Sequence, residues 1–76
     1  MLTKKRTHGR GQLRESVRWF LDSGEIELQA HDNPWMKISL MAPEAREARE
    51  LWGDGEEAGA LAALARCPGQ PNWFLD

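Results

Sequence analysis

The fold class of this 76-residue chain depends on the stretch EIELQAHDNPWMKISLM, residues 25–41. Apolar and polar residues alternate in 25–30 and again in 36–41, which predicts two half-buried β-strands. In the second strand, Met36, Ile38 and Leu40 are expected on the buried face. Residues 31–35 between them predict a turn, because Asn33-Pro34 continues neither a helix nor a central strand. The stretch therefore predicts a two-stranded antiparallel hairpin.

Helical spacing appears on both sides of this hairpin. Upstream, residues 12–22 place Leu13, Val17, Phe20 and Leu21 on one helical face, and Gly24 is expected to end the helix. Downstream, one helix is predicted to start at Pro43 and to end before residues 53–55. Its apolar stripe consists of Ala45, Ala48, Leu51 and Trp52. A last helix is predicted over 56–66, with its apolar face formed by Ala58, Leu61, Ala62, Leu64 and Ala65.

These elements predict a small α+β domain in the order helix, two-stranded antiparallel hairpin, helix, helix. We expect a basic flexible arm at 1–11, a single compact domain at 12–69 and an aromatic tail at 70–76. A chain of this length forms one domain with a barely sufficient core. Its apolar runs are far shorter than the roughly 20 residues that cross a bilayer, so no membrane association is expected.

The composition also bounds the chemistry. Cys67 is the single cysteine, so no internal disulfide forms, and the basic start of the chain is not followed by the apolar segment of a signal peptide. These features favour a cytoplasmic protein. His8, His31 and Cys67 share no metal-ligand spacing, and no pattern of a catalytic site stands out. We therefore expect no metal, no cofactor and no enzymatic activity.

Charge is distributed unevenly along the chain. Residues 1–18 hold six cations and one anion, a balance of +5, whereas residues 19–76 hold four cations and eleven anions, a balance of −7. The basic part could contact phosphates, an acidic protein surface or the acidic part of a second copy, or remain a solvated arm. A homodimer therefore stays open. The acidic surface expected on the second and third predicted helices consists of Glu44, Glu47, Glu50, Glu56 and Glu57. It is a candidate partner-binding surface, with Glu44, Glu47 and Glu50 as its main candidate residues, that could mimic nucleic acid, or else an ordinary solvated helix face.

Four tryptophans are unusual in so short a chain, and tryptophan is enriched where proteins bind one another. Trp19 and Trp52 are expected mainly to fill the core. Trp35 in the predicted turn and Trp73-Phe74 in the tail are harder to bury, which makes them candidate partner-binding residues. Two alternatives stay open for the tail, namely that it closes the core or that it docks on a partner.

Three motifs within residues 13–52 are LDSGEIE at 21–27, HDNPW at 31–35 and KISLMAPEAR at 37–46. In this order the stretch resembles the second half of winged-helix regulators of the multiple-antibiotic-resistance-regulator type. The resemblance implies that Arg14 and Arg18 lie on a recognition helix and that residues 31–35 lie on a wing.

Two functions follow from these features. The first is a non-catalytic small binding protein that docks on a larger protein or complex and modulates or inhibits it. In size and lack of motifs the chain is similar to phage-type inhibitors, such as anti-CRISPR proteins, and to accessory subunits. The alternative is a winged-helix-like DNA-binding transcriptional regulator. Its nucleic-acid contacts would be Lys4, Lys5, Arg6, Arg10, Arg14 and Arg18. The acidic body favours the first function, and the order of elements favours the second.

Overall fold

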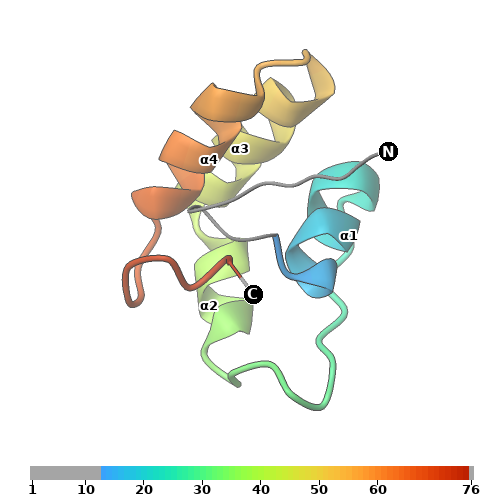
Figure 1. The fold of residues 1–76 in the computed structure, drawn as a ribbon, viewed down its shortest axis with the longest axis vertical. Coiled ribbons are helices and arrows are strands. Elements are labelled where there is room, and N and C mark those ends of the chain that lie inside the picture. Colours follow the sequence, from blue (N-terminus) through green and yellow to red (C-terminus); the bar gives the residue numbers. More distant parts are fainter. Residues whose placement is uncertain (1–12, 76) are drawn as a thin grey trace, which may run out of the picture.

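The computed structural model describes residues 13–75, which form four helices (Figure 1). They are α1 (Glu15–Ser23), α2 (Met36–Met41), α3 (Pro43–Gly53) and α4 (Glu57–Ala65). Helices α3 and α4 lie side by side, joined by a short turn, while α1 and α2 pack against α3. The predicted basic arm, residues 1–11, lies outside the described residues.

The predicted α+β class is wrong, because residues 13–75 contain no β-sheet. Residues 25–29 are irregular, and residues 36–41 form α2 instead of a strand. The β-type pairing within this part of the chain is one isolated antiparallel bridge between Leu13 and Leu75. Neither a two-stranded hairpin nor a helix of six residues is stable alone in water, so packing against the rest of the core decides which one forms.

The residues of α2 explain why a helix forms there. Met36, Ser39 and Leu40 are buried, which is the i, i+3, i+4 spacing of one helical face. The backbone N–H of Met36 donates to the carbonyl of Asn33 at 3.0 Å, so the turn at Pro34 leads directly into the helix. The Ser39 hydroxyl donates to the Pro68 carbonyl, which satisfies the one polar side chain that this face buries.

The predicted positions of the other three helices are confirmed. Helix α1 buries Val17, Phe20 and Leu21, and it ends at Gly24, whose φ of 83° is left-handed and whose N–H donates to the Phe20 carbonyl at 2.8 Å. Pro43 occupies the first turn of α3. Helix α4 buries a different face from the predicted one, because it is apolar on nearly all sides. Its buried residues are Ala60, Ala63 and Leu64, while Ala58, Ala62 and Ala65 are exposed.

Residues 70–75 belong to the same core as the helices. Trp73 and Phe74 are buried, with their ring centroids 5.5 Å apart in an edge-to-face arrangement. The Trp73 indole N–H donates to the Leu64 carbonyl at 3.3 Å, which ties this segment to the end of α4. Of the two alternatives left open for the tail, the structure therefore supports closure of the core by residues 70–75. Within residues 13–75, no helix combines the length and the hydropathy needed to cross a membrane.

Candidate interaction surface

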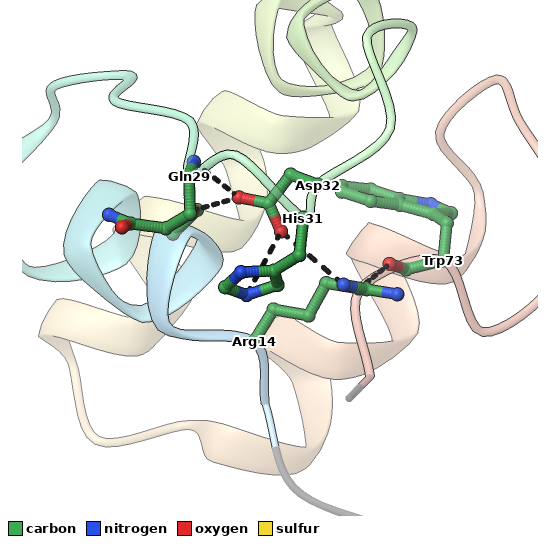
Figure 2. Close-up of polar contacts among 6 residues, drawn as sticks. Arg14, Gln29, His31, Asp32 and Trp73 are labelled. Carbon is green, nitrogen blue, oxygen red and sulfur yellow. Dashed lines mark hydrogen bonds and ion pairs between the residues drawn. The ribbon is translucent and has the colours of Figure 1, made fainter.

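The loop that leads from α1 to α2 is fixed by a group of polar contacts around Asp32 (Figure 2). Its carboxylate accepts hydrogen bonds from the Ser16 hydroxyl, from the Gln29 backbone N–H at 2.7 Å and from Arg14 Nη1 at 3.3 Å. Arg14 Nε also donates to the Trp73 carbonyl at 3.1 Å. We call these residues the Asp32 cluster. It joins the start of α1, the loop before α2 and the C-terminal segment, and so it positions α2.

The Asp32 side chain is only 1% exposed, yet its surroundings favour the charged form. Burial by itself raises the pKa of Asp32, because it removes water from the carboxylate. The hydrogen bonds from Ser16 and Gln29, followed by the charges of His31 and Arg14, outweigh that effect and lower the pKa below its ordinary value of 3.8. The His31 ring lies at the edge of this cluster, with Nε2 4.0 Å from Asp32 Oδ1.

Helix α2 turns two large apolar side chains toward solvent. Ile38 is 65% exposed and Met41 is 63% exposed, and they lie three residues apart on the same side of the helix. Trp35, a further three residues back, is half-buried and packs against the core. Its ring lies over Gly69, where an added Cβ would come within 3.0 Å of the indole. We call Trp35, Ile38 and Met41 the α2 apolar face.

The sequence prediction named Trp35 as a surface residue but missed Ile38 and Met41 as candidates. It placed Ile38 on the buried face, and this was wrong because a two-residue period was applied to a segment that is helical. The sequence did contain a signal for this face. A helical period applied to the same six residues predicts that Ser39 is buried and that Ile38 is exposed. Trp19 on α1 is a further exposed large side chain, although it was expected mainly to fill the core.

The remaining predicted partner-binding residues fall into two groups. Trp73 and Phe74 are buried in the core, so the folded chain does not offer their rings to a partner. Glu44, Glu47 and Glu50 lie on α3, where Glu44 is half-buried and Glu50 is exposed. Glu47 pairs with Arg66 at 2.9 Å between Oε1 and Nη2, and both side chains are about half exposed. Part of this acidic surface is therefore neutralised by a cation of the same chain.

Of the residues expected to contact nucleic acid, the described part of the chain contains Arg14 and Arg18. Arg14 is 20% exposed and is held by Asp32 and the Trp73 carbonyl, whereas Arg18 is exposed on α1. The predicted wing is absent, because residues 31–35 lead into a helix instead of joining two strands. Lys4, Lys5, Arg6 and Arg10 lie outside the described residues. Residues 13–75 hold six cations and eleven anions, so the described part of the surface is acidic.

Neither the cysteine nor the acidic residues form a metal site in the described part of the chain. No group of three or more His, Cys, Asp and Glu side chains lies close enough within residues 13–75 to hold a metal ion. Cys67 is buried, and its Sγ lies 3.7 Å from the Ala63 carbonyl. Burial, followed by the charge of Glu44, raises the pKa of the Cys67 thiol to about 11, against a smaller opposite effect of Arg66. The thiol is therefore protonated at neutral pH.

Comparison of the chain with known protein families, curated proteins and solved structures finds no match. Function is therefore inferred from the chemistry and the exposure of the described residues. Among the features above, the α2 apolar face combines exposure of large apolar side chains with a rigid attachment to the core.

Proposed function

We propose that this chain is a non-catalytic binding protein that docks on a larger protein partner through the α2 apolar face and modulates or inhibits that partner. The observation that carries the proposal is the exposure of Ile38 and Met41 on one turn of a helix whose opposite side is buried. Single exposed apolar residues are ordinary, but neighbouring ones beside a fixed tryptophan are typical of binding surfaces.

The rigid attachment of α2 supports this role. Met36, Ser39 and Leu40 anchor the helix in the core, and the Asp32 cluster fixes the loop before it. A preformed helix loses little conformational entropy when it binds, so more of the free energy of burial appears as affinity. Covering the exposed parts of Ile38 and Met41 is worth about 2–4 kcal/mol together.

Charge indicates what kind of partner fits. The α2 apolar face belongs to a body with six cations and eleven anions in residues 13–75, and α3, which follows α2 after one residue, begins with Glu44 in its first turn. A partner surface with an apolar centre and basic surroundings is complementary to this arrangement. The DNA-binding alternative draws less support, because Arg14 is already engaged and acidic residues outnumber basic ones in the described chain.

The test is affinity capture from a lysate of the organism that encodes the chain, carried out in parallel with and without nuclease. The double variant Ile38→Gln, Met41→Gln removes the apolar side chains and keeps residues that favour helix. Its matched control is Ala58→Gln, Ala62→Gln, two exposed positions on α4. We expect a stoichiometric protein that the wild type and the control retain and that the α2 variant binds at least tenfold more weakly.

Both variants are expected to unfold in urea at the wild-type midpoint, since all four positions are exposed. Equal capture by the α2 variant and the wild type, with stability unchanged, would refute docking through α2. Material that binds both proteins and disappears with nuclease would instead support the DNA-binding alternative.

A further inference from the structure

The turn between α3 and α4 lies at the opposite end of the molecule from α2 (Figure 1). A hollow lies at this turn. It has a volume of about 310 Å³ and is lined by Trp52, Gly55 and Glu57. Gly55 has a φ of +82°, and a Cβ added there would meet no heavy atom within 4 Å. At Gly55 the hollow is therefore lined by backbone alone, with open space where a side chain would stand.

The orientation of the Trp52 indole in this hollow is fixed. Its Nε1–H donates to Asp22 Oδ1 at 2.9 Å, across the contact between α3 and α1. The Trp52 carbonyl accepts the Gly55 N–H at 3.1 Å, which holds the turn against the end of α3. Trp52 is half-buried, so the hollow is bordered by an aromatic ring that is held in place before any ligand arrives.

Three carboxylates lie at or near this hollow. Glu57 borders the hollow and is exposed, Asp54 is exposed in the same turn, and Asp22 accepts the indole N–H. Within residues 13–75, none of these three carboxylates forms an ion pair with a side chain of the same chain. On the α1 side, the guanidinium of Arg49 lies against Gly24 and donates to the Ser23 carbonyl at 3.5 Å.

We infer that this hollow binds the guanidinium group of an arginine side chain that projects from the partner protein. A cation is attracted both to an indole ring and to a carboxylate, and Trp52 and Glu57 both line this hollow. Guanidinium fits better than ammonium, because it is flat, stacks on aromatic rings and donates two parallel hydrogen bonds to a carboxylate. The inference rests on the proposed binding role, since it adds a second contact to the same partner.

The test uses the full chain, labelled with ¹⁵N, and the probe acetyl-Gly-Arg-Gly-amide followed by NMR. The control probe has citrulline in place of arginine, which keeps the shape and removes the charge. We expect saturable shifts of the Gly55 amide and the Trp52 indole N–H with the arginine probe and weaker ones with citrulline. Glu57→Gln is expected to weaken the binding of the arginine probe about two- to fivefold, whereas the same change at exposed Glu27 has no effect.

Absence of shifts at Gly55 and Trp52, or equal shifts with the two probes, would overturn the inference. A lysine probe that binds as tightly as the arginine probe would overturn the assignment to guanidinium. Because the probe does not involve α2, this result is independent of the capture experiment. The probe experiment can therefore refute arginine binding in the hollow without refuting docking through the α2 apolar face, and the capture experiment can refute docking without refuting arginine binding.

Discussion

Replacement of Asp32 is the most informative perturbation of this fold, because its carboxylate holds the loop before α2 against the start of α1, where Arg14 also contacts the C-terminal segment. Asp32→Ala removes the acceptor of the Ser16 hydroxyl, the Gln29 N–H and one Arg14 N–H. Hydrogen bonds to a charged group contribute about 1.5–3 kcal/mol each, and a buried partner that is left unsatisfied adds to the loss. Gln29 is exposed and Arg14 is partly exposed, so water replaces part of what they lose. We therefore expect a net destabilisation of about 3 kcal/mol.

That loss is large for a domain of this size. A chain of 76 residues is stable by roughly 4–11 kcal/mol, and each kcal/mol lost lowers the Tm of such a domain by about 4–8 °C. The expected decrease in Tm is therefore about 12–24 °C, measured by circular dichroism at pH 7. The matched control is Glu27→Ala, which removes the same charge from the same loop. Within residues 13–75 the Glu27 carboxylate makes no ion pair, so less than about 0.5 kcal/mol is expected.

The pH dependence gives a second check on the same group. The folded pKa of Asp32 lies below the ordinary value of 3.8, so its contribution to stability is complete above that pH and is lost as the pH falls through the folded pKa. The difference in unfolding free energy between the wild type and Asp32→Asn is therefore expected to narrow in acid. An Asp32→Ala variant with the Tm of the Glu27→Ala control would refute the role assigned to the Asp32 cluster.

Three further predictions concern other parts of the fold. Gly24→Ala is expected to cost about 1–2 kcal/mol in urea unfolding, because Gly24 is left-handed and an added Cβ would lie 2.6 Å from Arg49 Cζ. Trp73→Ala is expected to cost about 3–5 kcal/mol, measured in the same way, because its ring is in the core; a variant of wild-type stability would contradict that position. Cys67, with its pKa raised by burial and by Glu44 to about 11, is expected to react with a thiol reagent at pH 8 far more slowly in the native protein than in urea.

Three of the four helices could be predicted from the sequence because each carries a long apolar pattern and a local start or stop signal. Gly24 ends α1 and Pro43 begins α3, and both signals act through backbone geometry that depends on the residue alone. The buried face of α4 could not be predicted in the same way. Its residues are almost all alanine and leucine, so every side of the helix is apolar, and contact with α3 decides which side is covered.

The candidate site was predictable only in part, and α2 shows why. Over the six residues 36–41, an alternating pattern and a helical pattern share Met36 and Leu40 as buried positions and differ at Ile38 and Ser39. Hydrophobicity alone favours burial of Ile38 over Ser39, because isoleucine is apolar and serine is polar. The choice is reversed by the Pro68 carbonyl, 29 positions away, which accepts the Ser39 hydroxyl and makes its burial acceptable.

The same reasoning applies to the Asp32 cluster, where the contact between Arg14 and the Trp73 carbonyl spans 59 positions. A sequence pattern of short period carries no information on which distant carbonyl a side chain will meet. From the sequence alone, Arg14 and Asp32 are each predicted to be exposed charged residues. In the structure they pair with each other, so neither is free to contact a partner. Because Ser39 takes the buried place of Ile38, the exposed side of α2 presents Ile38 and Met41 beside Lys37. The long-range contacts that hold the fold thus also decide which residues are left for binding.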